Sequence, residues 1–399
     1  MSETATPAHK PLGQILLRRT LIGFALLLLI LIPSVALFAL TGQPVATYSA
    51  MGTLAGAVAY FAGGFRIGFI TAIVISLLAP IAIVAGLSPV TGAALMALMT
   101  LMVGRMSRFG LHQAGMMVPI MLAWPLISPV PLLPRDIINK VNELLSHKGM
   151  TLTDAVNKHM AEGATHTSSG SSKLVDDALT FVIRQSHLDS SYLLLVVGVF
   201  FVGAIFPVLV LPALTKKITL PTPKDHTRSE ALPYTITIMV LTTVATYVVL
   251  EHPKMTGGAF LIASILVLAQ VGNTIKWKLT LERVLGTLAG VLIMMLIVQF
   301  AGVTTFVQVM GIPMPLGMYG IGLVFAIIAI IAKFSPRAWI YYVFIAPAAA
   351  CLNAFSFSGA GNLGEQRFWD NLIGAGLVVG AGLITLAATK LIKHEESAE

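Results

Sequence analysis

The sequence has 399 residues, of which 56% are hydrophobic and only 11% are charged, and its formal net charge is +8. Charged residues make up about a quarter of a typical soluble domain, so this chain has too much apolar surface for one water-soluble core. The composition excludes a soluble protein and predicts that lipid solvates most of the chain. The positive charge does not indicate nucleic-acid binding, because membrane proteins gather basic residues on one side of the bilayer.

Twelve apolar runs of roughly 16–24 residues recur along the chain, each near the length that crosses a bilayer as a helix. They lie at about 20–41, 45–63, 67–87, 89–104, 112–133, 191–214, 234–250, 256–272, 284–302, 316–332, 338–356 and 370–391. The expected fold class is therefore an all-α integral membrane protein with about twelve transmembrane helices. Three of the runs are short or only moderately apolar, so the alternative that one weak pair is re-entrant stays open.

Six runs precede a basic linker at 215–233 and six follow it. An even number per half inserts both halves in the same direction, which predicts two parallel six-helix halves, 1–214 and 234–391, followed by a tail at 392–399. Between the fifth and sixth runs, residues 135–189 show apolar positions at helical spacing. They are expected to form a helical insertion outside the membrane, which either docks another protein or is inert.

The basic residues predict the orientation of these runs. With an internal N-terminus, 17 of the 25 Lys and Arg residues fall in internal segments, and only Lys254 and Arg367 fall in short external loops. The other six lie in the long insertion, and long segments translocate largely regardless of charge. Both termini are therefore expected to be cytoplasmic, in a cell inner membrane.

Motifs of enzyme chemistry are absent from the sequence, which has no P-loop, no nucleophile elbow and no paired metal-ligand spacing. We therefore expect neither an enzyme nor a cofactor. Four histidines fall in the insertion, His147, His159, His166 and His187, but their irregular spacing favours surface histidines over a metal site.

Ionisable residues lie at the ends of the predicted spans. Glu251, Glu282 and Asp370 are the candidates for proton coupling, because a carboxyl group at membrane depth is costly unless it is used. Arg283 begins a span on the cytoplasmic side, opposite to Arg367, together with the neighbouring Lys276 and Lys278. This makes a helix N-terminus with an electropositive mouth suited to an anion. For each of these residues the alternative is an interfacial anchor.

The pentapeptide GTLAG occurs at 52–56 and again at 286–290. The two copies fall at different places in their halves, so they do not mark a repeat. Their small residues at small-xxx-small spacing predict faces where helices pack closely, through Gly52, Gly56, Gly286 and Gly290.

The stretch HPKMTGGAFLIASILVLAQVGNTIKWKLTLERVLGTLAGVLIMMLIV resembles the signature region of the fusaric acid resistance (FUSC-like) and aromatic acid exporter superfamily. Arg283, Gly286, Thr287 and Gly290 match its Arg-x-x-Gly-Thr-x-x-Gly pattern. Further along, RFWDNLIGAGLVVGAGL is similar to the last helix of that family, with Arg367, Asp370 and Gly374 in the matching positions.

The resemblance implies an inner-membrane exporter of aromatic or other small organic acids, often partnered by a periplasmic membrane-fusion subunit. The electropositive helix start and the positions that match the family pattern together give the candidate substrate-binding residues: Arg283, Thr287, Lys276, Lys278, Arg367 and Asp370. The chain differs from exporter-type relatives in lacking large cytoplasmic domains and in carrying the 135–189 insertion.

The leading hypothesis is proton-driven efflux of small organic anions, with the lipid bilayer as surroundings and a homo-oligomer as an option. A passive anion channel of the same fold is the first alternative, and a non-transporting envelope scaffold is the second. Basic residues before the 284–302 span and proline breaks near 310–320 favour transport, because a scaffold has no use for either.

Overall fold

A computed structural model describes residues 12–41, 44–129, 189–216, 223–252, 258–269, 271, 277–301, 306–309, 312–333, 338–353 and 357–396. Most of the predicted insertion at 135–189 lies outside the described residues, as do its four histidines, the middle of the linker, Lys254 and Lys276. The insertion therefore stays a prediction.

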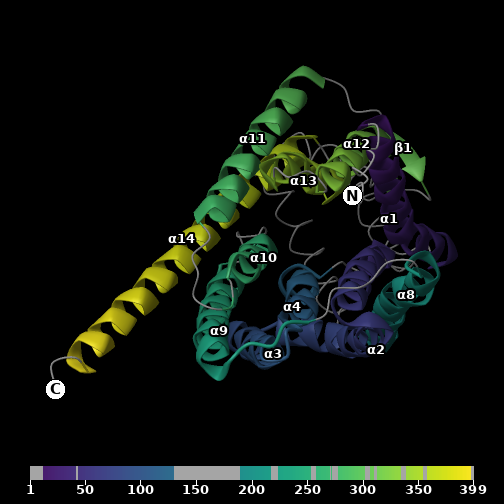
Figure 1. Cartoon of the computed structure of the whole chain (residues 1–399). Helices are drawn as coiled ribbons and strands as arrows, with labels where there is room; N and C mark the ends of the chain where they lie inside the picture. The colour runs from purple at the N-terminus through teal and green to yellow at the C-terminus, as the bar shows by residue number, and fades with distance from the viewer. Residues whose placement is uncertain are drawn as a thin grey trace, which may run out of the picture.

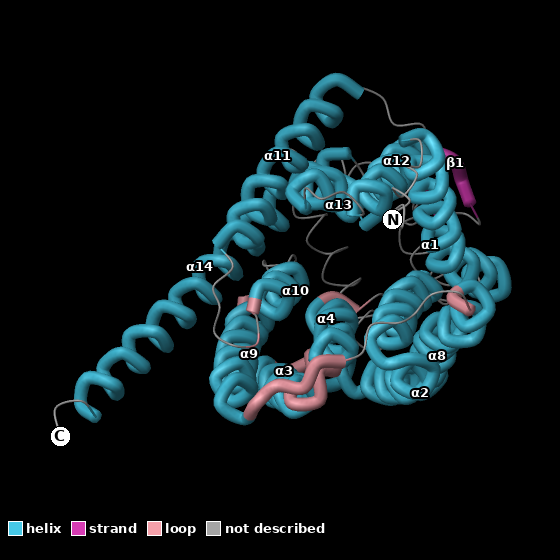
Figure 2. The backbone as a smooth tube through the Cα atoms, viewed as in Figure 1, coloured by secondary structure: helices cyan, strands magenta, loops and turns pink. Residues whose placement is uncertain are grey.

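The described chain is almost entirely helical (Figures 1 and 2). Its elements are α1 (Leu12–Thr41), the 3-10 turn η1 (Pro44–Thr47), α2 (Tyr48–Ala85), α3 (Pro89–Ser107), α4 (His112–Ile127), α8 (Ser190–Leu214), α9 (Arg228–Glu251), α10 (Gly258–Leu268), α11 (Trp277–Ala301), β1 (Phe306–Val309), β2 (Ile312–Pro315), α12 (Leu316–Lys333), α13 (Ala338–Asn353) and α14 (Phe357–Glu396). The expectation of an all-helical protein is confirmed except for β1 and β2, a two-stranded antiparallel hairpin in the region where the sequence indicated a proline break.

Six helical stretches in the described part of the chain are long and apolar enough to cross a membrane. They are Val45–Ala85, Pro89–Ser107, Ser190–Leu214, Arg228–Glu251, Thr280–Ile297 and Gly364–Thr385. Large apolar side chains such as Leu77, Leu194 and Ile384 are exposed on their surfaces, as lipid contact requires. The structure therefore fits a multi-pass membrane protein.

A helix overlaps each of the twelve expected runs, but the helix ends differ from the predicted ends. Helix α11 begins at Trp277, seven residues before the predicted span, and α14 begins at Phe357. Apolar residues indicate which part of a helix lies within the membrane, whereas the ends of the helix depend on its hydrogen bonds. At α9 the backbone N–H of Thr227 donates to the Glu230 carboxylate at 3.1 Å, which starts the helix six residues before its apolar run.

Helix α2 is two helices that fold back on each other at Gly64. Gly64 has φ 75° and ψ −169°, a conformation that is essentially restricted to glycine. A Cβ atom placed on Gly68 would lie 3.4 Å from the Cα of Tyr60. Eight residues of one straight helix would separate these positions by about 12 Å. The 45–63 and 67–87 runs are therefore adjacent arms of a tight helical hairpin.

The helices form a closed circuit in space (Figure 1). Helix α2 packs on α8, α4 and α1, and α4 packs on α10. Helix α10 packs on α14, α14 on α11, α11 on α13 and α13 on α12, which returns to α1. The two parts of the chain on either side of the linker are thus in contact through α3 with α9, through α4 with α10 and through α1 with α12.

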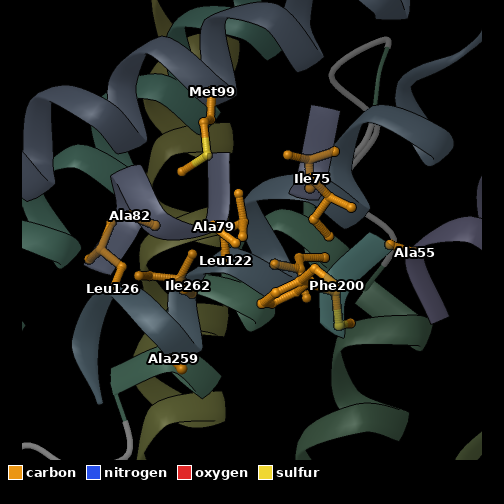
Figure 3. Close-up of a cluster of buried hydrophobic side chains, with 14 of the residues drawn as sticks. Ala55, Ile75, Ala79, Ala82, Met99, Leu122, Leu126, Phe200, Ala259 and Ile262 are labelled. Atoms are coloured by element: carbon orange, nitrogen blue, oxygen red, sulfur yellow. The ribbon is translucent and has the colours of Figure 1, made fainter. Parts of the chain in front are cut away.

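The main hydrophobic core also joins these two parts. It brings together Ile75, Leu122 and Phe200 from the first part and Ala259 and Ile262 from α10 (Figure 3). Helix α3 packs along α9 over much of its length, with Gly104 directly against Thr235. Helices α4 and α10 therefore share one core, and α10 also contributes a side chain to the polar cluster described next.

Candidate functional site

A buried polar cluster lies where α10, α11 and α14 meet. Arg283 of α11 donates from Nε to Asn371 Oδ1 of α14 at 2.9 Å and from Nη2 to Ser264 Oγ of α10 at 3.3 Å. Ser264 Oγ lies 2.6 Å from Asn371 Oδ1, to which it donates. One side chain from each of the three helices therefore meets the other two, among helices that are otherwise apolar.

The Asn371 amide has a fixed orientation in this cluster. Its Nδ2 donates to the backbone carbonyl of Arg367 at 2.9 Å, one turn earlier on α14. Its Oδ1 faces Arg283, which can only donate. Asn371 is 3% exposed and Ser264 is fully buried, so two buried side chains hold the part-buried Arg283 in place.

Aromatic rings lie under both guanidinium groups at this site. The Arg283 guanidinium carbon is 5.6 Å from the ring centroid of Tyr342 on α13, and that of Arg367 is 4.4 Å from the ring centroid of Phe260 on α10. Phe260 in turn makes an edge contact with Trp124 of α4, with centroids 5.1 Å apart. Such cation–aromatic contacts stabilise a charge where hydration is limited.

Two charged side chains of the cluster keep polar atoms without a hydrogen-bond partner among the described residues, namely Arg367 Nη1 and Asp370 Oδ2. Both atoms are buried, and Asp370 as a whole is 6% exposed. A buried donor and a buried acceptor without partners are costly in a protein interior. We call Ser264, Arg283, Arg367, Asp370 and Asn371 the arginine cluster, and these two atoms are its open bonding positions.

Glycines bring the three helices close enough for these contacts. A Cβ on Gly374 would lie 2.9 Å from the Ser264 Cβ, so α14 approaches α10 where only glycine fits. A Cβ on Gly286 would lie 2.7 Å from Tyr342 Cβ, and one on Gly290 would meet the Val343 carbonyl. The second GTLAG copy therefore presses α11 against α13 and sets Tyr342 beside Arg283.

The first GTLAG copy lies at a different helix pair with the same kind of contact. A Cβ on Gly52 would lie 2.6 Å from the Phe200 carbonyl of α8, and one on Gly56 would meet the Ala204 carbonyl. All four of these glycines thus lie where facing backbones approach, as the small-xxx-small interpretation expects.

The predicted site residues divide into those inside the cluster and those outside it. Arg283, Arg367 and Asp370 are inside, and Thr287 is buried one turn further along α11. Lys278 is exposed and lies 4.0 Å from Glu282 as a surface pair, while Glu251 is exposed at the end of α9. Lys276 lies outside the described residues. Of the three proton-coupling candidates, Asp370 alone is in the arginine cluster.

The expectation that Arg283 and Arg367 lie at opposite membrane faces is wrong. Asn371 receives a hydrogen bond from the Arg283 side chain and donates one to the Arg367 backbone, so one side chain joins them. The apolar runs place each arginine at the start of its span, and the two spans are expected to cross the membrane in opposite directions. They do not reveal how far neighbouring helices are shifted along each other.

Asn371 and Ser264 are the residues of the arginine cluster that sequence reasoning missed. Neither is charged: Ser264 stands alone in an apolar run, and Asn371 directly follows the charged Asp370. The available signal was the spacing of Arg367, Asn371 and Gly374, which places a charge, an amide and a small residue on one face of a helix.

Comparisons with known proteins identify no relative of this chain, since no family model, no curated protein and no solved structure matches it.

Proposed function

We propose that the protein is a secondary-active exporter of small organic anions, aromatic acids among them. The observation that carries this proposal is the hydrogen bond from the Arg283 side chain of α11 to the buried amide of Asn371 on α14, one turn from Arg367. Charges inside membrane helices are costly and are usually retained for function. A guanidinium group also matches a carboxylate in shape and charge better than any other side chain.

The proposal includes a membrane arrangement. The chain crosses the bacterial inner membrane about twelve times, in two parallel six-helix halves, with both termini in the cytoplasm. The helix directions around the cluster support alternate crossings. Phe260 and Ser264 follow α10 in the same direction as Arg367 and Asn371 follow α14. Helix α11 runs the opposite way, because Arg283 meets Asn371 and Val291 meets Gly364.

Asp370 is the proposed coupling residue. Its carboxyl group is buried and lies on the same face as Arg367, three residues earlier on α14. Protonation of Asp370 leaves the two arginines without a counter-charge, and deprotonation restores it. Anion binding to the arginines and proton binding to Asp370 are therefore linked through charge.

Membership in the FUSC-like exporter superfamily is part of this proposal and rests on the sequence pattern around Arg283 and Arg367. A periplasmic membrane-fusion subunit is the proposed partner. Neither an enzyme activity nor a cofactor is proposed.

Uptake of benzoate into inverted membrane vesicles, normalised to the amount of the protein, tests the proposal. Arg283→Gln is expected to raise the apparent substrate constant at least tenfold, since a charge-assisted hydrogen bond is worth roughly 1.5–3 kcal/mol. Arg283→Lys keeps the charge without the fork and is expected to retain part of the activity.

The same vesicles separate this proposal from its alternatives. Collapsing the proton gradient should abolish concentrative uptake by an exporter, whereas a channel would continue to pass benzoate down its gradient. Unchanged kinetics per molecule in the Arg283→Gln protein, with a lower amount of that protein and with Arg283→Lys fully neutral, would return Arg283 to the role of an interfacial anchor.

A further inference from the structure

The charges in the arginine cluster limit which anion it fits. We propose that this cluster binds singly charged organic anions and rejects doubly charged ones, and that Asp370 sets the limit. The inference rests on the proposed function, because it assigns a ligand to the same site. It adds the charge of the ligand and the residue that determines it.

The two positive charges contact the same stretch of α10. Arg283 Nη2 contacts Ser264, and the Arg367 guanidinium lies over Phe260. Phe260 and Ser264 are four residues apart on α10, and the Ser264 Oγ lies 2.7 Å from the Phe260 carbonyl. Such positions are about 6 Å apart along the helix axis, so an anion bound there would lie in the field of both charges.

Arg283 and Arg367 differ in how much of their bonding capacity is used. Arg283 spends Nε on Asn371 and Nη2 on Ser264. Arg367 Nη1 is buried and has no partner among the described residues. A ligand carboxylate that accepts from Arg367 Nη1 would satisfy this donor while it remains in the field of Arg283.

Asp370 is the charge that opposes these two. It is 6% exposed, and its Oδ2 has no partner in the described part of the chain. With Asp370 ionised, two guanidinium groups and one carboxylate carry a net charge of +1. A monoanion neutralises the cluster, whereas a dianion leaves one buried negative charge unmatched, which costs free energy where the dielectric constant is low.

The surroundings of the cluster suit a ligand with an apolar body. Tyr342 and Phe260 present ring surface beside the guanidinium groups, and Trp124 packs against Phe260. The ligand class is therefore a monocarboxylate attached to an aromatic or other apolar group.

Calorimetric binding to the purified full chain tests this with two probes that share one ring, monomethyl phthalate and phthalate. At about pH 8 both are fully ionised, and they differ by one charge. The wild-type protein is expected to bind the monoester at least tenfold more tightly than the dianion. Asp370→Asn raises the net charge of the cluster to +2 and is expected to remove or reverse that preference.

Two further variants serve as controls. Arg367→Gln combined with Asp370→Asn returns the net charge to +1, so preference for the monoester should reappear. Glu365→Gln removes an exposed carboxylate from the same helix and should leave the ratio of the two affinities unchanged.

Equal affinities of the wild-type protein for the two probes, or an unchanged ratio in the Asp370→Asn protein, would overturn this inference and leave the proposed function standing. Binding of neither probe to the wild-type protein would overturn both. The wild-type comparison decides the matter even if the Asp370→Asn protein does not fold.

Discussion

Arg283 keeps a permanent charge among apolar helices because neighbouring side chains share it. Asn371 and Ser264 accept its hydrogen bonds and Tyr342 lies under its guanidinium. Asn371 serves this arrangement as a positioning residue, since it also fixes its own amide on the Arg367 carbonyl. The positive charge is therefore a property of the Arg283 guanidinium itself, whereas the orientation of this side chain depends on Asn371.

Asn371 variants should separate these two properties. Asn371→Leu leaves Arg283 short of an acceptor and is expected to lower the free energy of unfolding by about 1–3 kcal/mol. Asn371→Asp keeps the acceptor but neutralises the charge of Arg283. It is expected to preserve the melting temperature better than Leu does, while anion affinity falls at least tenfold. Melting curves in detergent, paired with calorimetry, measure both. Full affinity in the Asp variant would show that the charge of Arg283 does not attract the ligand.

The sequence predicted the charged members of this site and missed the uncharged ones. Arg283 and Arg367 stand out because charges are rare in apolar runs. Asn371 and Ser264 gain their role only from the helices packed against them, and that packing is not readable from the periodicity of one helix.

At the scale of the element, the reversal of α2 depends on the backbone of Gly64. No heavy atom lies within 4 Å of a Cβ built there, so a side chain would meet no steric clash among the described residues. Its cost would come from the φ of 75°. Gly64→Ala is therefore expected to destabilise the protein by about 1–3 kcal/mol.

Gly198→Ala is the matched control for Gly64→Ala. Gly198 also has open space around it but lies inside α8 without a positive φ, so alanine should be neutral or slightly stabilising there. Equal melting temperatures for the two variants would show that the reversal tolerates an ordinary residue.

Substitutions at Gly290 test the packing of α11 on α13, because their effect comes from steric contact and not from the backbone conformation. Its Cβ would meet the backbone carbonyl of Val343, which cannot rotate away. Gly290→Ala is expected to lower the thermal stability and Gly290→Leu to abolish assembly, whereas Gly380→Ala, where no atom lies within 4 Å, should have little effect. Size-exclusion profiles and melting temperatures report the difference. Wild-type behaviour of Gly290→Leu would contradict close packing of α11 on α13.

Element positions were largely predictable because membrane-depth helices must be apolar over a set length. The element ends were not, since they depend on local caps and on polar helix formers such as the first residues of α11. The β1–β2 hairpin lies between two apolar runs, where proline content indicates a break without indicating its form.

At the scale of the whole molecule, orientation in the membrane is testable by labelling. Cysteines introduced at Ser169 and Lys224, in a Cys351→Ala background, should react with impermeant reagents from opposite faces, with Ser169 accessible from outside. The reason is the concentration of basic residues in the predicted internal segments. Labelling of both positions from one face would contradict the twelve-span arrangement.

The sequence indicated a division at the linker but not how the two parts meet. Helix α4 packs on α10, and Trp124 of α4 reaches Phe260 beside Arg367. Such contacts join residues far apart in the chain, and apolar runs of similar composition leave the choice of neighbours open. The two-half arrangement remains a prediction.

Helix α14 gives the site a mechanical property. It runs unbroken for 40 residues, or about 60 Å, and extends beyond the other helices toward the C-terminus (Figure 1). From Asn371 to Glu396 the helix is about 37 Å long, so a tilt of about 10° around the cluster would displace its far end by about 6 Å. A small tilt of α14 at Arg367 and Asp370 would therefore appear as a much larger displacement at the end of the helix near the C-terminus.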